Sequence, residues 1–115
     1  MTITMYGIPN CDTIKKAKKW LQEADISFDF HDYRKNGIDN TLVETFCQQL
    51  GWEQVLNKRG TTYRQLTQEQ KESVDQQSVV PLLVEHPAMI KRPILNVDGQ
   101  FHIGFKAPQY SDIFK

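Results

Sequence analysis

The sequence has no long hydrophobic run, and its charges balance. The longest uncharged apolar run, Val79 to Val84, has six residues, whereas a membrane-spanning helix needs about 20. The first residues contain no basic stretch followed by an apolar one, so we expect no secretory signal. Lysine and arginine total 14, as do aspartate and glutamate. A nucleic-acid-binding protein usually has a strong basic excess, so this balance argues against that class.

Cysteine is also scarce, and common cofactor motifs are missing. The chain has two cysteines, Cys11 and Cys47, too few for a small secreted domain held together by disulfides. Together with the missing signal, this low count predicts a cytoplasmic protein. The cysteines and the three histidines lack the paired spacing of a zinc site, and neither a nucleotide-binding glycine motif nor H-E-x-x-H is present. We therefore expect no bound metal or cofactor, no membrane contact, and a monomer, because no large apolar face is evident.

The first third of the chain has the pattern of a strand, a helix and a strand. Residues 2–6 are β-prone, and residues 26–31 alternate between apolar and polar side chains, which is typical of a strand. Between them, apolar residues at helical spacing predict a helix over about 12–23. We interpret the lysines on the opposite helix face as a solvated surface first and as a binding patch second. They are Lys15, Lys16, Lys18 and Lys19.

The middle of the chain is predicted to be helical, and the last third contains a hairpin. Thr67 and Gln70 form a capping box, which marks a helix start, and Asp98-Gly99 is a two-residue turn preferred by hairpins. Residues 78–86 fit either a buried strand or a helix. The other expected elements are helices over about 40–50 and 67–77, strands at 94–97 and 100–105, and a last helix from Pro108.

This order of elements predicts an α/β protein with a mixed four-stranded sheet. A βαβ unit places its two strands parallel with a right-handed crossover, and the hairpin adds two antiparallel strands. The order is that of a thioredoxin-like fold, with a helical insertion over about 34–88 between the N-terminal βαβ and the C-terminal ββα units. We expect residues 1–115 to form a single domain, because chains of this length usually do.

Cys11 is the candidate nucleophile, because it follows the first predicted strand and immediately precedes the first helix. Unpaired N–H groups and the positive end of the helix dipole meet there, and both favour the thiolate, which is the reactive form. Asp12 opposes this effect, so further cations are needed. The alternative is that Cys11 is a small buried residue. Cys47 lies on the apolar face of its helix and is expected to be an inert core thiol.

Ile14 occupies the place where a C-x-x-C enzyme has its second cysteine. Cys11 therefore cannot form the internal disulfide of such an enzyme, and a catalytic cycle on Cys11 needs an external thiol. Cytosolic glutathione is the obvious one. We expect glutathione to act as a co-substrate rather than as a bound cofactor.

Three segments of the sequence form a recognisable set: Gly-Ile-Pro-Asn-Cys at 7–11, Lys-Arg-Pro at 91–93 and Gly-Phe-Lys-Ala-Pro at 104–108. In these segments the chain resembles the ArsC/Spx family, most closely its YffB-like branch. The resemblance covers essentially the whole chain and implies a thioredoxin-like fold with Cys11 as nucleophile. It also implies that Arg92 is brought to the cysteine, with Pro93 after a cis peptide bond. Arg59 and Arg92 resemble the first and second of three oxyanion-binding arginines in arsenate reductases of this family, and Lys106 stands at the third position.

Cations at these positions would stabilise the thiolate and hold an anionic substrate. Lys106 keeps the positive charge but lacks the planar, two-pronged donor geometry of arginine. The blander interpretation of each cation is a solvated surface charge. We adopt that interpretation for Arg34, Lys58 and Arg64.

The chain departs from the arsenate reductases that it resembles at three positions near Cys11. Ile14 replaces a serine whose hydroxyl could donate to the thiolate, and Gly7 replaces a histidine. Asp12 adds a negative charge that repels arsenate. Together with Lys106, these departures disfavour arsenate as the substrate.

The sequence therefore predicts an oxidoreductase, namely a glutathione-dependent thiol–disulfide reductase with Cys11 as its single nucleophile. Arg59, Arg92 and Lys106 would bind glutathione carboxylates or a substrate anion. One alternative is arsenate reduction proper, by attack of the same thiolate on the oxyanion. The other, implied by the resemblance to Spx, is a regulator that binds RNA polymerase without catalysis, although its redox-sensing C-x-x-C pair is broken here at Ile14.

Overall fold

The computed structural model describes residues 2–9 and 11–114. Asn10, which the sequence places in the Gly-Ile-Pro-Asn-Cys segment at 7–11, lies outside the described residues. Contacts divide the chain into two compact units, Met1–Asn36 with Arg92–Lys115, and Gly37–Lys91. The helical segment expected between the two sheet-forming parts of the chain falls in the second unit.

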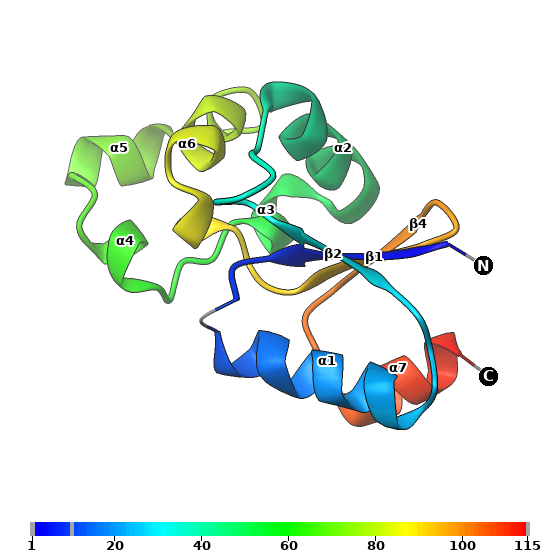
Figure 1. The fold of residues 1–115 in the computed structure, drawn as a ribbon. Helices are drawn as coiled ribbons and strands as arrows, with labels where there is room; N and C mark the ends of the chain where they lie inside the picture. Colours follow the sequence, from blue (N-terminus) through cyan, green and yellow to red (C-terminus); the bar gives the residue numbers. More distant parts are fainter. Residues whose placement is uncertain (1, 10, 115) are drawn as a thin grey trace. The chain divides into compact units, whose positions relative to one another are not determined.

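The first unit contains a four-stranded sheet with the order β2-β1-β3-β4 (Figure 1). Strand β1 pairs parallel with β2 and antiparallel with β3, and β3 pairs antiparallel with β4. The predicted mixed sheet of the thioredoxin-like fold is therefore confirmed. The strands are β1 (Ile3–Gly7), β2 (Asp29–Asp32), β3 (Ile94–Val97) and β4 (Gln100–Ile103).

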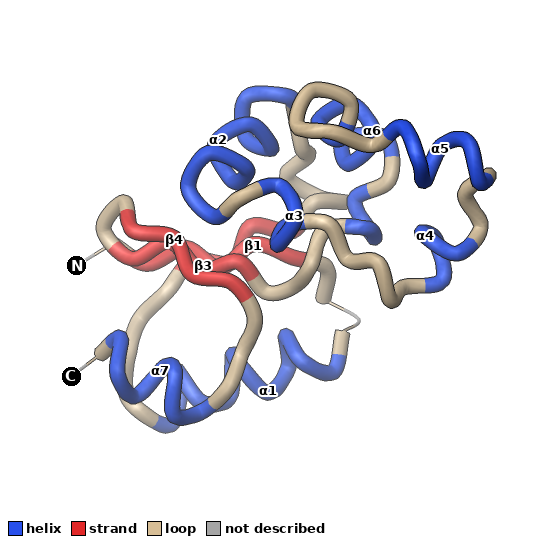
Figure 2. Tube along the Cα trace, turned by 180° about the vertical axis from the view of Figure 1, so that it is seen from behind, coloured by secondary structure: helices blue, strands red, loops and turns tan. Residues whose placement is uncertain are grey.

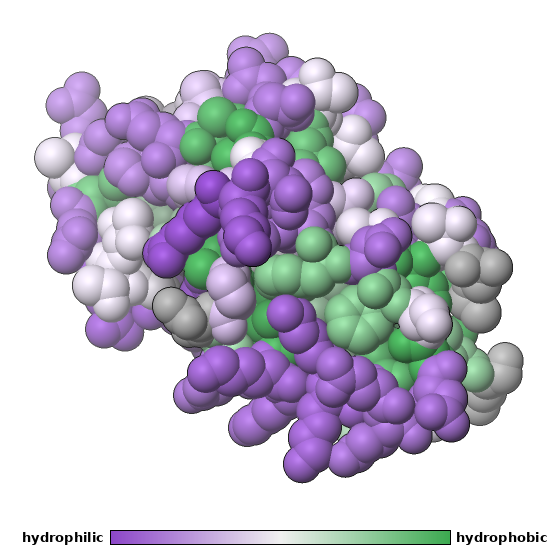
Figure 3. All heavy atoms as spheres, in the orientation of Figure 1, coloured by the Kyte–Doolittle hydropathy of each residue, from purple (hydrophilic) through white to green (hydrophobic). Residues whose placement is uncertain are grey.

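Two helices, α1 (Asp12–Glu23) and α7 (Ala107–Ile113), lie on the same face of this sheet (Figures 1 and 2). The core between them is formed by Ile3, Met5, Ile14, Ala17, Leu21, Leu95 and Tyr110. The outward face of α1 carries exposed lysines and forms a hydrophilic band in Figure 3. Lys18 differs from the others, because its Nζ lies 3.6 Å from the centre of the Phe30 ring, a cation–π geometry.

Strand β2 begins at Asp29, three residues later than the alternating pattern predicts. After α1, Asp25 has a φ of 58°, and the N–H of Ile26 donates to the carbonyl of Leu21 at 2.9 Å. Ile26 and Phe28 still pack against the core, but the pairing with β1 starts where Thr4 meets Asp29. The alternation therefore indicates which side chains face the core, and not where the strand pairing starts.

The hairpin is built as the sequence predicts. Asp98 and Gly99 have φ values of 52° and 92°, as a type I′ turn requires, and the Gly99 N–H donates to Asn96 Oδ1 at 2.7 Å. Strand β4 ends at Ile103 rather than at Phe105, because Gly104, with a φ of 78°, turns the chain away. Helix α7 starts at Ala107, one residue before the predicted Pro108.

The second unit is helical throughout its regular structure, apart from one isolated β-bridge between Leu56 and Ile90. Helix α2 buries Val43, Phe46 and Cys47, and Gly51 ends it with a φ of 88°, as expected. Helices α3 and α4 were not predicted, because four residues are too few to show a hydrophobic period. The elements are α2 (Asn40–Leu50), α3 (Trp52–Val55), α4 (Thr61–Arg64), α5 (Gln68–Ser73), α6 (Val79–Glu85) and the 3₁₀ helix Pro87–Met89.

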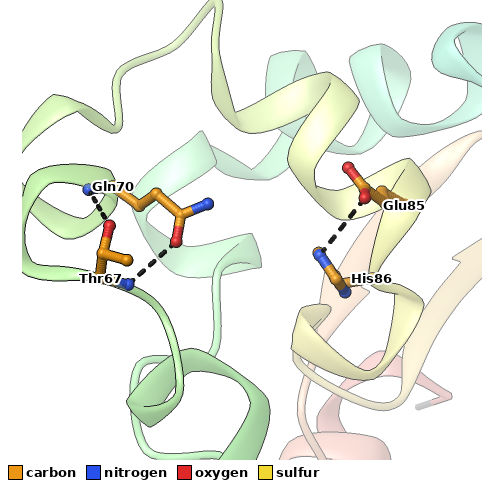
Figure 4. A network of polar contacts seen from close by, with 4 residues as sticks. All are labelled: Thr67, Gln70, Glu85 and His86. Atoms are coloured by element: carbon orange, nitrogen blue, oxygen red, sulfur yellow. Dashed lines mark hydrogen bonds and ion pairs between the residues drawn. The ribbon is translucent and has the colours of Figure 1, made fainter.

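The capping box at Thr67 and Gln70 forms both of its hydrogen bonds (Figure 4). Helix α5 nevertheless ends at Ser73 instead of about residue 77. The cause is Asp75, whose Oδ1 accepts the N–H groups of Gln77 and Ser78 at 3.0 and 2.8 Å and folds this segment into a turn. Residues 79–85 form a helix, which decides between the two structures that fit 78–86.

Candidate functional site

Cys11 occupies the N-cap position of α1, with extended backbone angles. Its carbonyl accepts the Lys15 N–H at 3.0 Å, and its side chain accepts no hydrogen bond from the described first turn of the helix. The thiol is partly buried and packs against the core cluster that contains Ile14. It therefore lies beside the unpaired N–H groups of a 12-residue helix, the end of a helix that attracts negative charge.

Gly7, the last residue of β1, is in close contact with the first turn of α1. A Cβ built on Gly7 would overlap the Cδ1 of Ile14 and would lie 3.4 Å from its Cγ1. Ile14 is 0% exposed, so its side chain has no solvent to move into. Gly7 and Ile14 are therefore apolar neighbours at the start of α1. In the arsenate reductases that this chain resembles, a histidine and a serine stand at these two positions.

Arg92 reaches the same place from the segment before β3. Its Cγ lies 3.9 Å from the position that a Cβ of Gly7 would occupy, and its side chain is partly exposed. The Arg92–Pro93 peptide bond is cis, as the resemblance implies, and Pro93 is buried. Because Ile94 is paired with Tyr6, the antiparallel pairing leads Pro93 toward Gly7. The structure thus brings Arg92 and Pro93 to the end of β1, next to the first turn of α1.

Tyr33 is a residue of this site that the sequence analysis missed. It follows β2, and its N–H donates to the carbonyl of Gly7 at 3.1 Å. Its side chain is 3% exposed. Burial, reinforced by the nearby Tyr6 phenol, raises the pKa of Tyr33 strongly, and the charge of Arg92 opposes this only in part. The signal was available, because β1 and β2 are parallel and their carboxyl ends meet at one edge.

Lys106 is tied to the site through the backbone. It is exposed and immediately precedes α7, and its carbonyl accepts the Tyr110 N–H at 3.1 Å. Two residues earlier, the Gly104 N–H donates to the carbonyl of Pro93 at 2.9 Å. The segment that leads to Lys106 is therefore held beside Pro93.

Arg59 belongs to the second unit, where it lines a surface hollow of about 500 Å³. Lys58 and Lys91 also line this hollow, with Glu53 as its one acidic residue. Its walls are joined by hydrogen bonds from the N–H of Lys91 to the Val55 carbonyl and from the N–H of Asn57 to the Met89 carbonyl, both 2.8 Å. The hollow has an excess of positive charge and can hold an anion. Lys58 and Lys91 contribute to it, although neither was predicted as a site residue.

Cys47 is 7% exposed and lies on the buried face of α2. Burial raises the pKa of its thiol, and the carboxylate of Glu44 adds to this effect. A thiol with a raised pKa is a poor nucleophile at neutral pH. The structure therefore leaves Cys11 as the accessible thiol.

Among the described residues, every helix is too short or too polar to span a membrane. Within residues 2–9 and 11–114, no group of three or more histidine, cysteine, aspartate or glutamate side chains could hold a metal ion.

Comparison with known proteins identifies the family. The model of the ArsC family matches residues 6–113. The chain belongs to the ArsC family. An uncharacterised protein of Haemophilus influenzae is 45% identical over 112 residues, which cover 97% of this chain and 98% of that protein. The global transcriptional regulator Spx of Bacillus subtilis is 24% identical over 105 residues, 90% of this chain and 79% of the regulator.

Solved structures of similar proteins have the same fold. A protein named YFFB is 43% identical to this chain with a TM-score of 0.92, and the match covers 96% of this chain and 97% of that one. A protein of Brucella melitensis described as related to arsenate reductase is 45% identical with a TM-score of 0.82, covering 100% and 96% of the two chains. The resemblance to the YffB-like branch that the sequence motifs indicated is thereby confirmed.

Proposed function

We propose that this ArsC family protein is a glutathione-dependent thiol–disulfide oxidoreductase in which Cys11 is the single nucleophile. One observation carries the proposal. Cys11 lies at the N-cap of α1 with a partly exposed side chain, whereas Cys47 is buried. Such a protein has one accessible thiol, so a second thiol that completes its catalytic cycle must come from another molecule.

The proposed reaction is a pair of thiol–disulfide exchanges. The Cys11 thiolate attacks the glutathione sulfur of a mixed disulfide, so that a bond between Cys11 and glutathione forms and the substrate leaves as a reduced thiolate. The thiolate of a second glutathione then attacks the glutathione sulfur on Cys11. Oxidised glutathione leaves and Cys11 is regenerated. The substrate disulfide is reduced, glutathione is oxidised, and protons are exchanged only with solvent.

Arg92 has the best-supported auxiliary role. Its stem lies at the end of β1 near Ile14, a member of the core cluster against which Cys11 packs. A guanidinium there would stabilise the thiolate and bind a carboxylate of glutathione through its two-pronged donors. We assign Arg59 and Lys106 to further anion contacts. Tyr33, with its raised pKa, stays neutral and adds no negative charge beside Arg92.

The same geometry favours a disulfide over arsenate as the substrate. Ile14 and Gly7 present carbon where an oxyanion would need hydrogen-bond donors, and the exposed Asp12 lies next to the cysteine. A disulfide sulfur needs a line of approach to the thiolate but no such donors. We place the reaction in the cytoplasm, where glutathione is kept reduced, and assign it to a monomer.

Intact mass spectrometry after reaction with oxidised glutathione across a pH series tests the proposal. An ordinary free cysteine has a pKa of ~8.5. We expect one glutathione adduct to form well below that pH. Cys11→Ser should abolish the adduct, while Cys47→Ser, the matched control, should leave it unchanged. An adduct on Cys47, or reaction only near pH ~8.5, would contradict the proposal. If stoichiometric RNA polymerase capture accompanied that result, the Spx-like alternative would be favoured.

A further inference from the structure

Gly7 is the point where three segments of the first unit meet. Gly7 itself is the last residue of β1. The Ile14 side chain comes from the first turn of α1, and the Arg92 stem comes from the segment before β3. Both neighbouring side chains lie within 4 Å of the place where a Cβ on Gly7 would be. No positive φ requires glycine here, so the requirement for glycine comes from this close approach.

We propose that Gly7 and Ile14 are positioning residues that hold the stem of Arg92 so that its guanidinium stays beside Cys11. The inference rests on the role of Arg92 in the proposed function. Ile14 is fully buried, and its Cδ1 and the Arg92 Cγ both lie within 4 Å of the same point beside Gly7. Glycine at position 7 allows the isoleucine and the arginine stem to be close neighbours.

The packing matters because arginine has a long, flexible side chain. Holding such a side chain in one arrangement costs rotamer entropy, and an exposed charge that is not held contributes little. An apolar contact on the stem fixes the direction of the side chain while the charged end stays in water. The Gly7–Ile14 contact would thus help to keep the Arg92 charge near the sulfur of Cys11.

The substitutions that test this proposal leave the other charged groups of this region in the sequence. Asp12 and Lys15 follow Cys11 in the first turn of α1, and the neutral Tyr33 phenol lies close to Arg92 from the end of β2. Lys106 follows the segment that is hydrogen-bonded to Pro93. A change in the pH dependence of Cys11 therefore reports on Arg92 and not on a change in these groups.

The test measures the rate of glutathione adduct formation at Cys11 against pH. Arg92→Ala should move the profile to higher pH by about one unit, the lower end of what a neighbouring opposite charge produces. Gly7→Ala should move the profile in the same direction, because its Cβ would overlap the Ile14 Cδ1 and the displaced isoleucine would no longer hold the Arg92 stem. Valine lacks the Cδ1 that the new Cβ would overlap. The double variant Gly7→Ala with Ile14→Val should therefore reverse at least half of the shift that Gly7→Ala causes alone.

A role through Arg92 also predicts non-additivity. In the Arg92→Ala background, Gly7→Ala should cause no further shift. If Gly7→Ala does not fold, Ile14→Ala, which leaves the stem unsupported, should give the upward shift by itself. The inference is wrong if Arg92→Ala shifts the profile but Gly7→Ala or Ile14→Ala, when folded, keeps the wild-type profile. If Arg92→Ala causes no shift, the proposed role of Arg92 fails, and the inference fails with it. A missing wild-type adduct would overturn the proposed function itself.

Discussion

Tyr110 carries a buried hydroxyl whose energetic role can be measured. The residue is 0% exposed, and its hydroxyl has no hydrogen-bond partner among the described residues. A buried polar group without a partner costs free energy, whereas the ring packs edge-on against Trp20 and Phe105, with centroids 5.6 and 4.7 Å away. The ring stabilises the core, and the hydroxyl does not.

Tyr110→Phe should therefore leave the free energy of unfolding unchanged or raise it by up to about 1 kcal/mol. Tyr110→Ala, which also removes the ring, should lower it by about 3–5 kcal/mol. Urea unfolding of the two variants and the wild type measures both changes. A loss of more than 1 kcal/mol in Tyr110→Phe would show that the hydroxyl has a partner after all.

At the scale of elements, the N-cap of α2 offers a direct comparison with that of α5. Asp39 Oδ1 accepts the Leu42 N–H at 2.8 Å, and α2 buries an apolar face. Asp39→Ala should lower the free energy of unfolding by about 1 kcal/mol. Asp39→Ser should lower it much less, because serine can also cap the helix.

Helix α5 has an equally good cap at Thr67 but no buried residue. Thr67→Ala should therefore speed amide hydrogen exchange within α5 and change global unfolding much less than Asp39→Ala does. Equal losses of global stability in the two alanine variants would mean that α5 unfolds together with α2.

The elements also show what the sequence could predict. Helices α1 and α2 and the hairpin were predicted well, because each has a hydrophobic period or a turn signal within itself. The start of β2 was missed because it depends on pairing with β1, and α3 and α4 because they are too short for a period. At the site, Cys11, Arg92 and Pro93 were available from motifs. The close approach of Ile14 and Arg92 to Gly7 depends on the tertiary fold, whereas the hydrogen bond from Tyr33 to Gly7 follows from the parallel pairing of β1 and β2.

For the molecule as a whole, two buried tyrosines predict loss of stability in alkali. Burial raises the pKa of both Tyr33 and Tyr110 in the folded protein, while an unfolded tyrosine titrates near ~10. Above that pH the unfolded chain releases protons that the folded protein keeps, so unfolding is favoured as pH rises. Their contribution is fully present below pH ~10 and is lost above it.

Thermal unfolding between pH 8 and 11.5 measures this effect. The free energy of unfolding should fall above pH ~10 by about 1.4 kcal/mol per pH unit for each tyrosine. Tyr110→Phe should make the slope shallower by one such group, and that difference removes the contributions of lysine and cysteine titration. Identical slopes in the two proteins would mean that Tyr110 ionises in the folded state.

The burial of Cys47 makes Cys11 a natural attachment point. With one accessible sulfur, a maleimide dye or spin label would couple to the unmodified protein at a single place, the N-terminus of α1. A spin label there lies at the end of a helix. Its mobility should fall when a ligand or a protein binds over the thiol. In cells treated with a mild oxidant, a cellular thiol bonded to Cys11 would remain attached through purification under non-reducing conditions. The mass of the purified protein would then identify that thiol.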